Sequence, residues 1–240
     1  MTLLTHDGFM FLLRWFHFLA GITWIGMLYY FNFVQTPFFA TVEAPVRSGI
    51  VAGGLLDRAL WWFRWGAMIT FITGWLMTFD LMFSRYGGPQ GFFGDQYGFK
   101  IFFGGMLGSL MWFNVWFVIW PAQQVVMASA KKIKDGGQAI PEAAARGQRA
   151  GFASRTNTLL SIPMLFFMGA ASHLPMPSPT SGGQKWGALA LLLVVLVAAE
   201  VNAMVGTAGA GKKMLGTVKG TFWGGFVLTA ILWGGLAILF

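Results

Sequence analysis

The chain has 240 residues, of which 56% are hydrophobic and only 10% are charged, and its formal net charge is +8. Soluble domains usually have about a quarter of their residues charged, so this composition excludes a water-soluble globular protein. Long apolar stretches recur along the whole chain, which excludes intrinsic disorder. The sequence has no cysteine, which excludes disulfides, zinc–thiolate sites, iron–sulfur clusters and covalently attached haem c.

Six stretches are long and apolar enough to cross a bilayer, which takes roughly 20 residues per helix. We therefore predict an all-α protein, a single polytopic membrane domain over residues 1–240 with about six transmembrane helices. The fourth span contains Pro163, which a membrane helix tolerates where its neighbours satisfy the freed carbonyl groups. The predicted spans are 11–36, 60–83, 99–120, 158–174, 186–206 and 218–240.

The basic residues are distributed unevenly between the two sides of these spans. Twelve of the 16 Lys and Arg residues follow the first, third and fifth spans or flank them. The positive-inside rule then places the 121–157 loop in the cytoplasm, with an interfacial helix in its Ala-rich part, and both termini on the non-cytoplasmic side. Topology accounts for the positive charge, and no basic stretch is typical of a nucleic-acid-binding module. The lipid bilayer is the expected partner, and nucleic acid is not.

Ionisable residues inside a predicted span are candidates for function, because the bilayer disfavours them. Arg14 and His17 lie three residues apart on one face of the first span, and Gly21 follows one turn later. A glycine beside an imidazole leaves a flat space that suits a porphyrin edge, and Arg14 would then meet a haem propionate. The same pattern suits a histidine that is hydrogen-bonded inside a helix bundle, and the residues alone do not choose between the two.

His173 stands at the outer end of the fourth span, after the small residues 169–172. The predicted orientation places it in the same half of the membrane as His17, so these two histidines are able to ligate the iron of one haem b. Whether the two histidines can share a haem without strain depends on how deep His17 lies in the membrane. His17 lies about 5 Å deep if its helix begins at Arg14, and about 12 Å deep if the helix begins at Phe9, where sharing one haem becomes strained.

A second group of polar residues lies toward the predicted cytoplasmic side. Asn114, Arg155, Asn157 and Glu200 combine a carboxylate with amide and guanidinium donors, which are the groups that a substrate or proton site needs. The alternative is a buried ion pair in which Glu200 meets a nearby arginine and ties helices together. The other polar residues of this region are Asn32, Gln35, Arg64 and Asn202.

Four segments carry a resemblance to a known family. They read RWFHFLAGITWIG over 14–26, YFNFVQ over 30–35, NVWFVIWPAQQ over 114–124, and ASRTNT through SIPM to SH over 153–173. Together they resemble the membrane N-terminal domain of the PuuD-type urate oxidases, or urate hydroxylases. The His-x-x-Ala-Gly-x-x-Trp part of the first segment is also similar to HemJ-type protoporphyrinogen oxidases and to CopD-like membrane proteins.

The resemblance implies a haem-b-binding oxidoreductase of the bacterial inner membrane. Such a protein oxidises urate to 5-hydroxyisourate and passes the electrons to a c-type cytochrome. In the family a cytochrome c domain usually follows the membrane part, and this chain has no Cys-x-x-Cys-His motif. A separate c-type cytochrome, or other subunits of an electron-transfer complex, is therefore the expected partner. Two alternatives stay open: a non-enzymatic accessory subunit of a respiratory or photosynthetic complex, and a HemJ-like porphyrinogen oxidase.

Overall fold

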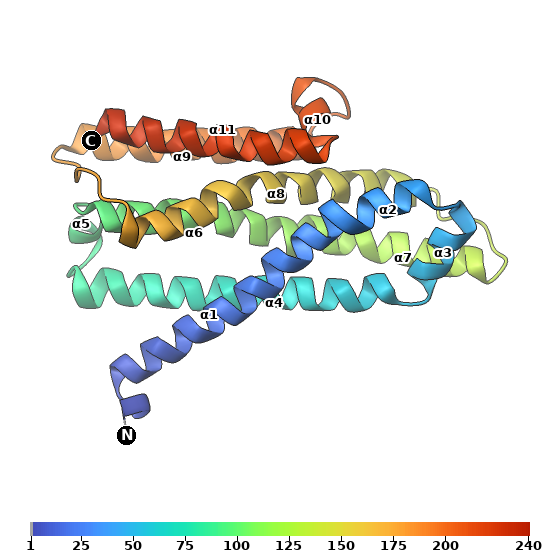
Figure 1. Cartoon of the computed structure of the whole chain (residues 1–240), viewed down its shortest axis with the longest axis horizontal. Coiled ribbons are helices and arrows are strands. Elements are labelled where there is room, and N and C mark those ends of the chain that lie inside the picture. Colours follow the sequence, from blue (N-terminus) through green and yellow to red (C-terminus); the bar gives the residue numbers. More distant parts are fainter. Residues whose placement is uncertain (1) are drawn as a thin grey trace.

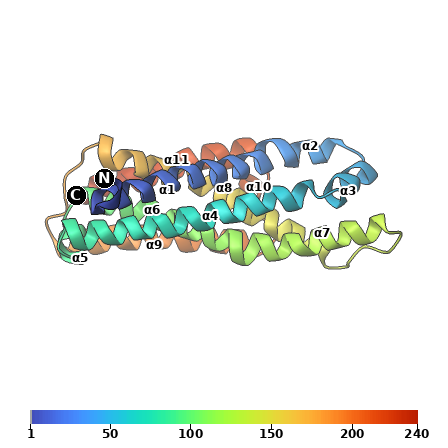
Figure 2. The ribbon, with the colours of Figure 1, turned by 90° about the horizontal axis from the view of Figure 1, so that it is seen from below.

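The molecule is a bundle of long helices, and the computed structural model describes residues 2–240 (Figure 1). No strand occurs among these residues, so the prediction of an all-α membrane protein is confirmed. Both termini lie at one end of the bundle (Figures 1 and 2). The helices are α1 (His6–Tyr29), α2 (Thr36–Thr41), α3 (Ala44–Ala52), α4 (Leu55–Asp80), α5 (Pro89–Phe92), α6 (Gln96–Phe113), α7 (Trp120–Lys134), α8 (Ala143–His173), α9 (Gly182–Met204), α10 (Ala210–Leu215) and α11 (Val218–Leu239), with a 3-10 turn η1 (Thr2–Leu4).

Three of the long helices contain a π-helical segment, in which the backbone hydrogen bonds are one residue longer than in an α-helix. Segment η2 (Tyr30–Gln35) joins α1 to α2, η3 (Leu81–Arg85) extends α4, and η4 (Asn114–Ile119) joins α6 to α7. Pro37 and Pro121 follow η2 and η4 closely. Proline has no N–H, and its ring crowds the carbonyl four residues earlier, so both prolines favour this wider turn.

Five helical segments are long and apolar enough to cross a membrane: His6–Thr41, Leu55–Arg85, Gln96–Lys134, α9 and α11. The remaining predicted span, 158–174, is the second half of α8, whose first half is polar. Helix α8 runs through the centre of the bundle and contacts α1, α6, α7, α9, α10 and α11. The polar residues in the middle of α8, Thr156, Asn157, Thr158 and Ser161, are therefore buried by protein.

Five of the predicted spans correspond to longer helical segments, whereas α11 (Val218–Leu239) ends one residue before its predicted span does. Residues 121–157, predicted to be a cytoplasmic loop with one interfacial helix, are mostly helical, because α7 continues to Lys134 and α8 already begins at Ala143. The connection between them is confined to residues 135–142. The first helix also begins early, at His6, because the side chain of Thr5 caps it by accepting a hydrogen bond from the backbone N–H of Gly8.

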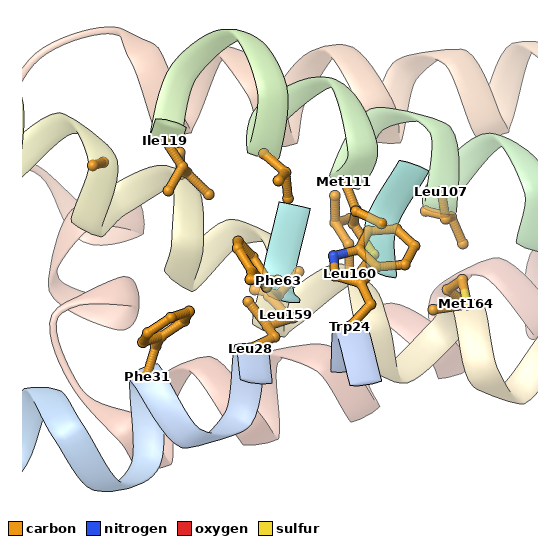
Figure 3. Packing of buried hydrophobic residues seen from close by; sticks show 14 of the residues in the cluster. Trp24, Leu28, Phe31, Phe63, Leu107, Met111, Ile119, Leu159, Leu160 and Met164 are labelled. Atoms are coloured by element: carbon orange, nitrogen blue, oxygen red, sulfur yellow. The ribbon is translucent and has the colours of Figure 1, made fainter. Parts of the chain in front are cut away.

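The buried core forms where α1, α4, α6, η4 and α8 meet (Figure 3). Trp24 and Leu28 of α1 pack there against Phe63 of α4 and Leu160 of α8. Outside this core, long rows of Phe, Trp, Leu, Ile and Val side chains are exposed, as expected for helices that face lipid tails. Helix α1 crosses α4 diagonally and has few other neighbours (Figure 1), so most of its aromatic side chains are exposed.

Close contact between α8 and α11 depends on Gly225. A Cβ atom added to Gly225 would lie 2.8 Å from the carbonyl oxygen of Leu159. That carbonyl is four residues before Pro163 and therefore has no N–H partner from within its own helix. A glycine at this point lets α11 cover the freed carbonyl, which is how a proline becomes tolerable inside a spanning helix.

We predict that Gly225→Leu destabilises the bundle by about 1–3 kcal/mol, because the added side chain overpacks the α8–α11 contact. Thermal unfolding in detergent measures the effect. Gly234→Leu on the same helix is the matched control, since a Cβ there meets no atom within 4 Å. Equal melting temperatures for the two variants would contradict the role of Gly225.

The connection between η3 and α6 is fixed by a hydrogen bond in which the hydroxyl of Tyr86 donates to Oδ1 of Asp95 at 2.9 Å. Burial and this carboxylate raise the pKa of Tyr86 to about 12, whereas an unfolded tyrosine ionises near 10. The folded state keeps the proton between these values, so Tyr86 stabilises the fold fully below about pH 10 and loses that contribution as the pH rises toward 12. We predict that, as the pH is raised, the tyrosinate absorbance of the wild type shows a last phase near pH 12, and that Tyr86→Phe removes this phase. Identical titration curves for the two proteins would refute the prediction.

Candidate functional site

A polar cavity opens at the end of the bundle that carries α2, α3 and α10. It measures about 800 Å³, including the part that is open to the exterior. The apolar lining includes Phe31, Leu56, Phe63, Ile119 and Phe152. The polar lining consists of Asn32, Gln35, Thr36, Gln123, Gln148, Ser154 and Arg155.

The amide of Asn32 is held in place by two hydrogen bonds. Its Nδ2 donates to the carbonyl oxygen of Leu28 at 2.9 Å and to Oγ of Ser154 at 2.8 Å, which ties η2 to α8. In contrast, Oε1 of Gln35 and Nη1 of Arg155 are buried and have no hydrogen-bond partner among the described residues. A buried polar atom without a partner is costly, so these two atoms mark where a ligand would complete the site.

Asn114 and Asn157, predicted to share a site with Arg155, form a separate network. Both are fully buried, at 0% exposure. Nδ2 of Asn114 donates to Oδ1 of Asn157 at 3.0 Å, and Nδ2 of Asn157 donates to the carbonyl oxygen of Met111 at 2.9 Å. Neither asparagine lines the polar cavity. These bonds connect α8 to the junction of α6 and η4.

Glu200 belongs to this asparagine network. It faces Asn114, and both Oδ1 of Asn114 and Oε2 of Glu200 lack a partner within residues 2–240. Both atoms are acceptors when the carboxyl is ionised, so neither can satisfy the other in that state. The ion pair considered from the sequence is not formed, because no salt bridge involves Glu200 in the described part of the chain.

His17 lies at a second, smaller cavity between α1, α4, α6 and α8, of about 430 Å³ including its open part. Its Nδ1 is 3.1 Å from Oγ1 of Thr73. That hydroxyl already donates to the carbonyl oxygen of Ile69 at 2.7 Å, so it accepts from Nδ1–H of His17. The proton is thereby placed on Nδ1, and Nε2 keeps the lone pair that a metal ligand needs.

Small and sulfur-containing residues form the rest of this histidine cavity. Gly74 lies against the imidazole, and a Cβ added there would be 3.0 Å from Cε1 of His17. The lining also includes Gly104, Gly108, Met164 and Met168. The missing side chain of Gly74 on α4 therefore makes room for the imidazole itself. The predicted glycine, Gly21, does not line this cavity and faces Thr70 instead.

The structure does not bring His173 to the histidine cavity. His173 is exposed at the end of α8, and the next residue, Leu174, accepts a hydrogen bond from Nζ of Lys100 at 2.7 Å. Because α1 begins at His6, His17 is about 16 Å along its helix, which is the strained case for a shared haem. Arg14 is exposed, one turn before His17.

Comparison with known proteins identifies the chain. The family model described as urate oxidase N-terminal matches residues 83–233, which is more than half of the sequence. The chain belongs to the urate oxidase N-terminal family. No curated protein and no solved structure matches the chain.

The part that matches the urate oxidase N-terminal family includes Asn114, Arg155, Asn157, His173 and Glu200. It does not include α1 and η2, which supply His17, Arg14, Asn32 and Gln35. The membership therefore rests on the segment from η3 to α11. The candidate residues His17, Asn32 and Gln35 are identified from the cavities that they line in the bundle.

Sequence reasoning missed several residues of these cavities in this urate oxidase N-terminal family member. Gln123, Gln148 and Ser154 were not singled out, nor were Met164 and Met168. One signal was available for the polar cavity, because Phe-Val-x-x-Pro occurs at 33–37 and again at 117–121. Both copies coincide with a π-helical segment, and such segments are frequent at functional sites.

We predict that Asn157→Leu lowers the free energy of unfolding by about 1–3 kcal/mol, because it leaves Asn114 and the Met111 carbonyl without their partner. Thermal unfolding in detergent measures this. Thr158→Val is the control, since that hydroxyl bonds only the carbonyl of Ser154 in its own helix. A loss no larger than that of the control would show that the network does not stabilise the bundle.

Proposed function

We propose that the polar cavity binds urate, or a closely related planar oxopurine, and that the chain is the membrane part of an oxidoreductase acting on it. The observation that carries this proposal is the pair of unpartnered buried atoms, Nη1 of Arg155 and Oε1 of Gln35, at one cavity. One is a cationic donor and the other is a neutral acceptor. Membership of the urate oxidase N-terminal family supports the choice of substrate.

Urate is complementary to this lining. It is a flat anion at neutral pH, with carbonyl oxygens that accept hydrogen bonds and ring N–H groups that donate them. The Arg155 guanidinium would bind its carbonyl edge in a planar fork, and the oxygen of Gln35 would accept from an N–H. The phenyl rings of Phe31, Phe63 and Phe152 at the same cavity provide flat apolar surfaces for the ring system.

The proposed reaction is a two-electron oxidation. Urate and water give 5-hydroxyisourate, two electrons and two protons. Arg155 and Gln35 would orient the substrate, while the apolar wall would limit the access of water to the ring. Glu200 and Asn114 lie outside the cavity lining, so we assign them to holding a proton in the bundle interior and not to contact with the substrate.

Haem b is the proposed electron acceptor, and His17 would bind its iron through Nε2. When bound, a haem supplies one-electron redox chemistry that urate and the side chains lack. Thr73 fixes the imidazole tautomer, and the missing side chain of Gly74 makes room for the imidazole against α4. For the second ligand, Met164 and Met168 line the same cavity, whereas His173 would have to reach it from the end of α8.

A c-type cytochrome is the proposed partner that takes the electrons, and the bacterial inner membrane is the proposed location. The five apolar helical segments support a multi-pass protein. Both termini lie at the same end of the bundle (Figure 1), toward which α1 leads from His17. A soluble cytochrome would meet the protein on that side.

The first test is urate binding by the purified full chain. We predict that Arg155→Met weakens binding roughly 10- to 100-fold, because a charge-assisted hydrogen bond to the anion is lost. Arg155→Lys should recover only part of the affinity, since lysine keeps the charge without the planar fork. Arg149→Met is the matched control, because Arg149 is an exposed arginine of the same helix. Equal binding by Arg155→Met and Arg149→Met would reject the polar cavity as the urate site.

The second test is a reduced-minus-oxidised visible spectrum with haem quantification. His17→Ala should abolish the b-type spectrum, and His6→Ala, which replaces an exposed histidine of the same helix, should leave it intact. His173→Ala and Met168→Leu then decide the second ligand, because only loss of the true ligand changes the spin state. A chain that binds neither haem nor urate would favour the accessory-subunit alternative, and haem-dependent oxidation of a porphyrinogen would favour the HemJ-like one.

A further inference from the structure

A third cavity is an apolar groove between α8, α9, α10 and α11. It measures about 960 Å³, including its open part, and nearly all of its lining is aliphatic. Leu159, Val195, Leu228 and Ile231 form its long wall. At its other end lie Thr156 and Asn202. The eight residues from Val195 to Asn202 span about 10 Å along α9, so the groove is elongated with a polar end.

Thr156 is the residue that points to a ligand. It is only 2% exposed, and its Oγ1 has no hydrogen-bond partner in the described chain. Other buried threonines of the bundle donate to the carbonyl four residues earlier in their own helix: Thr73, Thr78, Thr158, Thr221 and Thr229. Thr156 does not donate to such a carbonyl, although it also lies inside a helix. Its hydroxyl is therefore available to a group that enters the groove.

Asn202 adds an amide to the same end of the groove. The side chain of Asn202 packs directly on Gly211, where an added Cβ would be 2.3 Å from its Oδ1, so only glycine at 211 permits this position. The ammonium group of Lys212, the residue that follows Gly211, already has partners within the protein. Its Nζ donates to the carbonyl oxygen of Ala203 at 2.9 Å and lies 4.1 Å from the ring centre of Phe152. Burial lowers the pKa of Lys212.

We propose that this groove binds a membrane-soluble quinone, with a ring carbonyl near Thr156 and Asn202 and the isoprenoid tail along the aliphatic wall. A quinone ring is uncharged and carries carbonyl acceptors, which match a hydroxyl and an amide donor. A phospholipid fits less well, because none of the described residues that line the groove is charged, and a phosphate group favours Lys or Arg. The proposal does not depend on urate or haem binding.

The test uses the full chain in phosphatidylcholine nanodiscs and a photoreactive azido-benzoquinone with a decyl tail. Illumination followed by peptide mass spectrometry should place the label on α8, α9 or α11, and excess decyl-benzoquinone should compete it away. Thr156→Val should reduce specific labelling roughly five-fold, because one hydrogen bond is lost. Ala198→Phe, which fills the groove from α9, should abolish it.

Thr229→Val is the matched control. Thr229 is a buried threonine of α11 whose hydroxyl is already bonded to the carbonyl of Gly225 at 2.8 Å, so labelling should match the wild type. Elution volume and melting temperature report whether each variant is folded. Labelling that ignores Thr156→Val and Ala198→Phe overturns the proposal. So does crosslinking between two copies of the chain through the groove.

Discussion

The central position of α8, a helix with a polar first half in an otherwise apolar bundle, is the constraint on which the remaining structure depends. A bilayer offers no water to satisfy polar groups, so α8 is surrounded by other helices, and they supply its partners. Asn32 of η2 bonds Ser154, Tyr29 of α1 bonds Ser161 at 2.9 Å, and Asn114 bonds Asn157. The lipid-facing surfaces of α1, α4, α9 and α11 need no such partners and are accordingly apolar.

The π-helical segments connect this constraint to the cavities. Each adds one residue to a helical turn, so the side chains beyond it are rotated relative to an uninterrupted α-helix. Segment η2 directs Phe31, Asn32 and Gln35 toward the polar cavity, and η4 begins at Asn114 and ends at Ile119, which is in the cavity wall. Because proline follows both segments, the wide turns are set by the sequence. A regular helix would bury a different set of residues at these positions.

The sequence predicted the all-helical membrane class well, since hydropathy over 20 residues is a strong signal. The site residues were harder to predict, because a site depends on the direction in which each side chain points from its helix. Arg155 and Asn157 are two residues apart, or about 200° around a helix, so they face opposite ways, and grouping them treated sequence proximity as spatial proximity. The pairing of His17 with His173 depended on where α1 begins, and the Thr5 cap that fixes this precedes the apolar stretch. The orientation of the imidazole depends on Thr73, which is 56 residues away, and no local pattern predicts such a contact.

Three consecutive residues of α8 face three different parts of the bundle. Arg155 points an unpartnered nitrogen at the polar cavity, Thr156 presents an unpartnered hydroxyl to the apolar groove, and Asn157 anchors the buried network with Asn114. Successive residues are rotated by about 100°, so Arg155, Thr156 and Asn157 necessarily reach three different neighbours. A shift of α8 along or about its axis would move all three together. The network at Asn157 holds that axis in register, and the geometry of both cavities therefore depends on a pair of asparagines that touches neither of them.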